Sequence, residues 1–114
     1  MADDIVYINI EEGLKRMMNN GKLFSKLLVK FKNDASLEET EAAFAAGDLE
    51  KAKNSAHTLK GLAANLSLIE LFNKVFELET RLKAGNFDAD QMALVKSVYA
   101  QTIIESDKVI EKYA

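Results

Sequence analysis

Apolar side chains recur every three or four residues along most of this 114-residue chain, which is the spacing of helices that bury one face. The pattern predicts a short helix over 10–18, a long helix over 22–46 and a third helix from about 49 to 66. A fourth helix is predicted to begin near Ser67 and to end before Gly85, and a last one to begin within 88–91 and continue to Tyr113. Residues 1–8 are predicted to be a tail.

The long helix has one clear alternative. The segment Ser36-Leu37-Glu38-Glu39 has the Ser-x-x-Glu pattern of a capping box and could begin a new helix. We favour one long helix with a bend, and a break at 33–36 is the alternative. A second capping box is predicted at Ser67-Leu68-Ile69-Glu70. The apolar positions that keep helical spacing through the long helix are Phe24, Leu27, Leu28, Phe31, Ala35, Ala42 and Ala45.

Long helices with one apolar face each must bury those faces against one another, so we predict an all-α fold. The expected arrangement is an antiparallel up-down four-helix bundle with a short additional N-terminal helix, in a single domain over 1–114. The absence of proline agrees with long helices. Three pairs of opposite charge at i,i+4 are predicted to lie on the solvent side of the fourth helix and to carry no function: Glu70 with Lys74, Glu77 with Arg81 and Glu79 with Lys83.

The only histidine, His57, lies on the water-facing side of the third predicted helix. Lys53 and Lys60 stand one turn before and one turn after it, and Gly61 and Ala64 leave little bulk around the imidazole ring. A glycine inside a helix costs about 0.5–1 kcal/mol relative to alanine, and close approach by another surface would explain it. Spacing alone does not separate a functional histidine from a solvated one. At 100° per residue, His57 points away from a stripe formed by Leu49, Ala52, Ala56, Leu59, Ala63 and Leu66.

The run His57-Thr58-Leu59-Lys60-Gly61, preceded by Ala56 and followed by Ala63, Asn65 and Leu66, resembles the signature of histidine-containing phosphotransfer (HPt) domains of bacterial phosphorelays. The resemblance extends to residues 31–34, 45–48 and 78–86, so it covers nearly the whole chain. Ser67 departs from the family pattern, which usually has a glycine ten residues after the histidine. The departure leaves the geometry of that turn open.

The resemblance implies a helical bundle that serves as a phosphorelay intermediate. His57 is expected to accept a phosphoryl group from the phosphoaspartate of a receiver domain and to pass it to another response-regulator receiver. The receiver is expected to bring the Mg²⁺, and a hybrid histidine kinase is the other implied partner. Lys60 is expected to offset the charge of the phosphoryl group. Lys53, Asn54, Gly61 and Ala64 are expected to contact the receiver.

The composition of the chain argues against several other classes of protein. The net charge is −3, with lysines scattered among acidic residues, so nucleic-acid binding is not expected. No run of eighteen apolar residues predicts a membrane span, and we expect a cytoplasmic monomer. One histidine without cysteine cannot supply the usual zinc ligand sets, and no Gly-rich loop supports ATP binding. We therefore expect a phosphocarrier without a cofactor of its own, not an enzyme. The alternative is a helical interaction module that binds receiver or kinase domains and transfers nothing.

Overall fold

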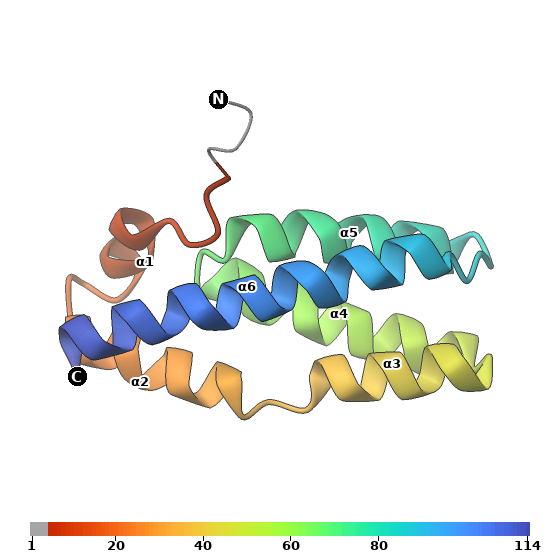
Figure 1. The fold of residues 1–114 in the computed structure, drawn as a ribbon, viewed down its shortest axis with the longest axis horizontal. Helices are drawn as coiled ribbons and strands as arrows, with labels where there is room; N and C mark the ends of the chain where they lie inside the picture. Colours follow the sequence, from red (N-terminus) through yellow and green to blue (C-terminus); the bar gives the residue numbers. More distant parts are fainter. Residues whose placement is uncertain (1–4) are drawn as a thin grey trace.

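The computed structural model describes residues 5–114, and these fold into helices with no strand among them (Figure 1). The prediction of an all-helical fold is confirmed over this range. None of the helices within it is both long enough and apolar enough to cross a membrane. The helices are α1 (Ile10–Arg16), α2 (Gly21–Lys32), α3 (Ser36–Ala46), α4 (Leu49–Asn65), α5 (Ile69–Lys83) and α6 (Ala89–Tyr113).

Apart from α1, the helices lie along one another, and after α3 the chain reverses direction from each helix to the next (Figure 1). In this view α2 and α3 follow each other along one edge in the same direction, and α4 returns beside α3. The next helix, α5, packs against α4, and α6 then packs against both α5 and α2. This arrangement leaves α4 between α3 and α5, with one side toward the interior and one toward solvent.

The predicted long helix over 22–46 is wrong, because residues 33–35 separate α2 from α3. Side chains in this segment bind backbone groups that a continuous helix would use. The Asn33 side-chain amide donates to the Val29 carbonyl at 3.1 Å, and Asp34 Oδ1 accepts from the Ser36 backbone amide at 2.7 Å. The break also changes which face of the second half is buried. Ser36, Thr40 and Ala43 are buried, and the predicted positions Ala35, Ala42 and Ala45 are exposed.

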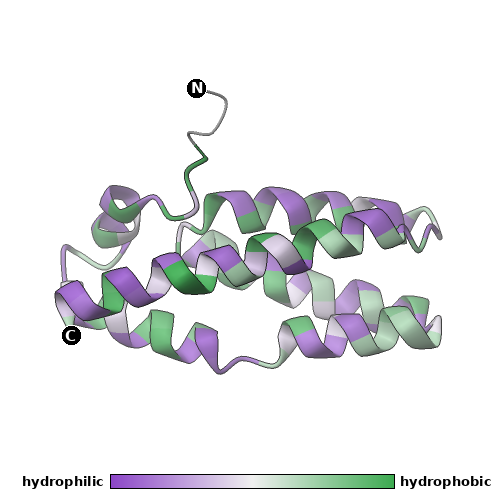
Figure 2. Ribbon diagram, viewed as in Figure 1, coloured by the Kyte–Doolittle hydropathy of each residue, from purple (hydrophilic) through white to green (hydrophobic). Residues whose placement is uncertain are grey.

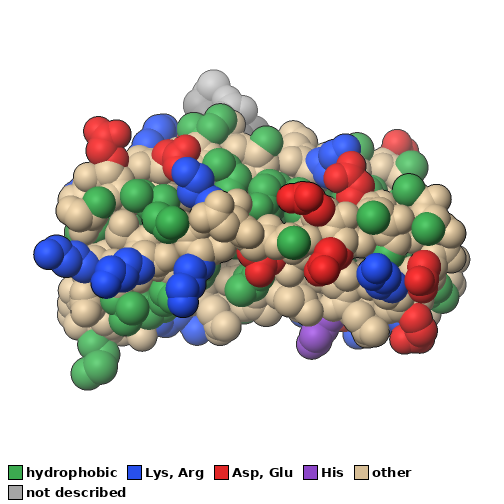
Figure 3. Space-filling model, turned by 90° about the horizontal axis from the view of Figure 1, so that it is seen from below, with side chains coloured by type: hydrophobic (Ala, Val, Ile, Leu, Met, Phe, Trp, Pro, Cys, Tyr) green, Lys and Arg blue, Asp and Glu red, His purple; other side chains and the backbone are tan. Residues whose placement is uncertain are grey.

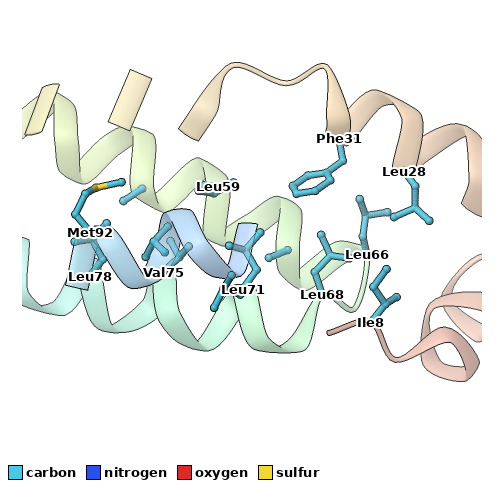
Figure 4. Packing of buried hydrophobic residues seen from close by; sticks show 14 of the residues in the cluster. Ile8, Leu28, Phe31, Leu59, Leu66, Leu68, Leu71, Val75, Leu78 and Met92 are labelled. Atoms are coloured by element: carbon cyan, nitrogen blue, oxygen red, sulfur yellow. The ribbon is translucent and has the colours of Figure 1, made fainter. Parts of the chain in front are cut away.

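Hydrophobic and hydrophilic residues follow one another in short stretches along each long helix (Figure 2). Figure 4 shows Phe31 of α2, Leu59 of α4, Val75 and Leu78 of α5 and Met92 of α6 within the shared interior, and all five are buried. Full burial of such a side chain contributes about 1.5–3 kcal/mol. The core therefore fixes the orientation of α4 and α5, which carry the site described below.

The N-terminal segment contacts the rest of the fold before α1 begins. Ile8 is buried, and the Asn9 backbone amide donates to the Ser67 carbonyl at 2.9 Å. Asn9 also caps α1, because its Oδ1 accepts from the Glu12 backbone amide at 3.1 Å. The predicted tail therefore ends before Ile8, and its first four residues lie outside the described range.

Candidate functional site

The histidine helix α4 begins and ends close to where the sequence predicts. Asp48 caps it, with Oδ1 accepting from the Lys51 backbone amide at 3.1 Å. The His57 side chain is 69% exposed, so the prediction that it faces water is confirmed. In Figure 3, which views the molecule from below, the histidine projects from the edge of the surface. The predicted stripe holds the helix against the core, since Ala52, Ala56, Leu59, Ala63 and Leu66 are all buried.

A buried carboxylate lies beneath this exposed ring. Glu79 of α5 has a side chain that is only 5% exposed, and its Oε2 is 2.9 Å from His57 Nδ1. Its other oxygen, Oε1, is 2.6 Å from Lys60 Nζ, and Lys83 Nζ lies 3.7 Å from Oε2. One carboxylate thus joins the histidine to two lysines on two helices.

The contact with Glu79 determines what each nitrogen of His57 can do. An ionised carboxylate only accepts hydrogen bonds, so Nδ1 carries the proton and donates it to Oε2. Nε2 then keeps its lone pair and, as part of a largely exposed side chain, can attack an electrophile. The same hydrogen bond fixes the orientation of the ring, as carboxylates do behind metal-bound histidines.

Glu79 is ionised at neutral pH. Burial raises the pKa of Glu79, but hydrogen bonds from Lys60 and His57 and the charges of Lys60 and Lys83 lower it by more. The net pKa is below the usual value of 4.5. The site therefore holds a carboxylate that is negative, buried and matched by two ammonium groups.

Sequence reasoning missed this role of Glu79. The Glu79–Lys83 pair does form, but the prediction that it lies on the solvent side is wrong for the carboxylate. The spacing of the sequence could have indicated that Glu79 is buried, because Glu79 follows Val75 by four residues and precedes Leu82 by three. These are the intervals of the buried stripe, so a carboxylate there needs a partner. The other two predicted pairs, Glu70 with Lys74 and Glu77 with Arg81, form at 3.5 Å.

The other predicted site residues surround His57 to different degrees. Lys60 is only 18% exposed, with its ammonium group 5.3 Å from the Phe76 ring centroid. Lys53 pairs with Glu50 at 3.1 Å. Asn54 and Gly61 are exposed and Ala64 is half-buried. A Cβ atom added to Gly61 would meet no atom within 4 Å, so the surface beside the imidazole is open. No group of three His, Cys, Asp or Glu side chains that could hold a metal occurs within residues 5–114.

The turn after α4 differs from its prediction. Ser67 does not cap α5, which has Leu68 at its N-cap and no side-chain cap. Its backbone has φ +56°, a left-handed conformation that glycine adopts without strain. The Ser67 hydroxyl instead donates to Glu12 Oε1 at 2.7 Å and ties α1 to the turn. The glycine usual at this position in HPt domains therefore suits the backbone geometry, and the serine gains a hydrogen bond.

Comparisons with known proteins identify a family for this chain. No curated protein and no solved structure matches the chain. The model of the family described as Hpt domain matches residues 27–106, which is more than half of the chain and includes both His57 and Glu79. Hpt domains are phosphocarrier modules of phosphorelays and are not catalysts in themselves. With its exposed histidine on a helical scaffold, this chain belongs to the Hpt domain family.

Proposed function

We propose that the chain is a phosphorelay intermediate, an up-down four-helix bundle in which His57 takes a phosphoryl group from the phosphoaspartate of one receiver domain and gives it to a second receiver. One observation carries the proposal. His57 donates from Nδ1 to a buried carboxylate, and its other nitrogen belongs to a side chain that is 69% exposed. A surface histidine with no role would not need a buried partner whose desolvation is costly.

The transfer step uses only the imidazole of this chain. The Nε2 lone pair attacks the phosphorus atom as the phosphorus–oxygen bond to the aspartate breaks, and the electron pair of that bond leaves with the aspartate carboxylate. The proton stays on Nδ1, so the phosphorylated ring carries a positive charge that Glu79 stabilises at 2.9 Å. The reverse sequence returns the phosphoryl group to an aspartate of the second receiver.

The lysines make this site attractive to an anion. Alone, the Glu79 carboxylate would repel an incoming phosphoryl group. Lys60 and Lys83 lie within 2.6 Å and 3.7 Å of its oxygens, so two positive charges oppose one negative charge. Lys60 therefore offsets charge at the site, and it does so through Glu79. The receiver supplies Mg²⁺ and its own acidic pocket, since this chain needs no metal for the step.

The surface around His57 fits contact by a folded domain. Gly61 has open space above its Cα atom and Asn54 is exposed, so a receiver can approach the ring closely. Lys53 and Ala64 extend this surface along α4. A hybrid histidine kinase is the source of the first phosphoaspartate, and the chain works as a monomer in the cytoplasm, where such kinases hold their receiver domains.

The test is phosphoryl transfer with Mg²⁺ from a panel of phosphorylated receiver domains of the encoding organism. We expect an acid-labile, base-stable phosphate on the native chain and none on His57→Gln. A folded native chain that binds one of these receivers and stays unlabelled would refute the proposal and favour the interaction module.

A second comparison separates docking from chemistry. Phosphoramidate is a small donor that can phosphorylate imidazole without a protein partner. We expect Gly61→Glu to accept phosphate from phosphoramidate like the native chain and to accept little from a receiver. Equal transfer from the receiver to both chains would show that the face beside His57 is not used for docking.

A further inference from the structure

The outer face of α2 carries three lysines that have no partner in the described chain. Lys22, Lys26 and Lys30 follow one another at four-residue intervals, and all three are exposed. None of them forms an ion pair with a carboxylate of residues 5–114, whereas the neighbouring Lys32 pairs with Asp107. We call these three residues the α2 lysine strip.

The strip is part of a wider separation of charge. The four charged residues of α2 are all lysines, and the three charged residues of α3, Glu38, Glu39 and Glu41, are all acidic. Figure 3 shows basic side chains in a row over the α2 half of this face and mostly acidic ones, with some basic ones among them, over the α3 half. Although the net charge of the chain is −3, the end of the molecule formed by α2 is positive and attracts anionic surfaces.

A groove connects the strip to the histidine helix. It has a volume of about 520 Å³ and is lined by Leu27, Lys30 and Phe31 from α2 and by Leu62 and Asn65 from α4. Leu62 follows His57 by five residues, which is about 8 Å along the helix axis. The groove thus lies along the next turns of the helix that carries His57. Its lining is mostly apolar, and Lys30, Arg16 and Asp34 are its charged members.

The strip winds toward this groove. Each step of four residues turns the position by about 40° around the helix. Lys22 and Lys26 accordingly border a hollow beside Ile110 of α6, whereas Lys30 borders both that hollow and the groove beside α4. The positive charge therefore leads along α2 toward the face that carries His57.

A domain that docks on His57 is wide enough to extend to the near end of the strip. A protein interface of ordinary size occupies about 800 Å² on each partner, which is a patch about 30 Å across. Centred between α2 and α4, a patch of this width extends over the groove to Lys30 as well as to His57. Lys26 and Lys22 lie one and two turns further along α2, where they act on the partner before contact.

We infer that the α2 lysine strip docks the acidic edge of a receiver domain, whose apolar side chain enters the groove between α2 and α4. This inference rests on the proposed function. A receiver that presents a phosphoaspartate and the carboxylates that bind Mg²⁺ is negative where it faces His57. Its negative charge is attracted by the lysine strip and repelled by the acidic residues of α3, so docking has one favoured orientation.

The experiment measures association, which requires no phosphoryl transfer. Fluorescently labelled receiver domains of the encoding organism are mixed with three chains in a stopped-flow instrument at low and high salt. The chains are the native one, the strip variant Lys22→Gln/Lys26→Gln/Lys30→Gln, and a control variant Lys74→Gln/Lys96→Gln/Lys108→Gln with the same change in net charge. The control lysines already pair with Glu70, Glu41 and Glu105.

We expect the strip variant to associate about tenfold more slowly than the native chain at low salt, with a smaller difference at high salt. The control variant should stay within about twofold of the native chain, because its lysines face carboxylates of their own. Equal rates for the two variants would overturn the inference, as would receivers that do not bind at all. Loss of binding to anionic vesicles or duplex DNA by the strip variant, with receiver association unchanged, would also overturn it. A receiver that binds through the strip but transfers nothing refutes the proposed function and leaves the docking inference standing.

Discussion

Replacement of Glu79 by glutamine removes one negative charge and leaves the size of the side chain nearly unchanged. In the native chain His57 Nδ1 is 2.9 Å from Glu79 Oε2, and the glutamine amide can still reach this nitrogen. The amide can donate a hydrogen bond to Nδ1 as well as accept one from it. When it donates, the proton moves to Nε2 and the nucleophilic lone pair is lost from the exposed side. Under the proposed function, the substitution also removes the charge that would stabilise the phosphorylated ring.

The expected magnitude follows from the hydrogen bond that is weakened. A hydrogen bond to a charged group contributes about 1.5–3 kcal/mol. Because about 1.36 kcal/mol corresponds to a factor of ten in rate, we expect phosphoryl transfer from a receiver to slow about 10- to 100-fold. Loss of a carboxylate behind a metal-bound histidine has a similar cost, about 10- to 100-fold.

Rapid-quench transfer from a phosphorylated receiver measures this effect. Glu77→Gln is the matched control, because Glu77 is on the same helix, pairs with Arg81 at 3.5 Å and is 58% exposed. We expect Glu77→Gln to transfer at the native rate. If Glu79→Gln also does so while retaining the native circular dichroism spectrum, the proposed role of the carboxylate is refuted.

The remaining predictions concern stability and are read from urea titrations. Because the Glu79 pKa is lower in the folded state than its usual 4.5, the stabilisation by this carboxylate is complete above pH 4.5 and is lost as the pH falls through the folded pKa. The native chain should therefore lose its advantage over Glu79→Gln below pH 4.5, and a constant difference between pH 7 and pH 3 would contradict this. Gly61→Ala should stabilise by about 0.5–1 kcal/mol, since the added Cβ meets no atom within 4 Å. Gly13→Ala should instead destabilise by about 1–3 kcal/mol, because its Cβ would lie 2.5 Å from Phe24 Cζ, and equal effects of the two substitutions would refute the steric argument. Ser67→Ala should be less stable than Ser67→Gly by about 1 kcal/mol, because both lose the hydroxyl and only glycine relieves the strain at φ +56°. Equal stability of these two variants would contradict that assignment.

Helical periodicity was sufficient where each helix faces a continuous core. The stripe that includes Ala56 and Leu59 predicts both the buried side of α4 and the exposure of His57. Asp48 and Asp88 also cap α4 and α6. Each side chain accepts a hydrogen bond from the backbone amide three residues later, as short-range sequence patterns predict. These features depend on neighbours within one or two turns, which a single sequence contains.

Features that depend on tertiary contacts were predicted less well. Glu79 has both a local partner, Lys83, and two distant ones, His57 and Lys60, and only the packing of α5 on α4 reveals the distant pair. The Ser67 hydroxyl similarly binds Glu12, which is 55 residues away. The break before α3 arose from a competition among local hydrogen bonds that apolar spacing does not record.

The exposed nitrogen of His57 has a kinetic consequence. If His57 relays phosphoryl groups as proposed, the chain offers one acceptor atom on one face, so a donor and an acceptor receiver cannot occupy it together and the first must dissociate before the second can bind. Such a relay is a double-displacement cycle, in which the donor is spent before the acceptor is loaded. Excess unphosphorylated acceptor then competes with the donor for the same face and slows the cycle. The throughput of the relay is set by how quickly each partner leaves as well as by how quickly the phosphorus moves.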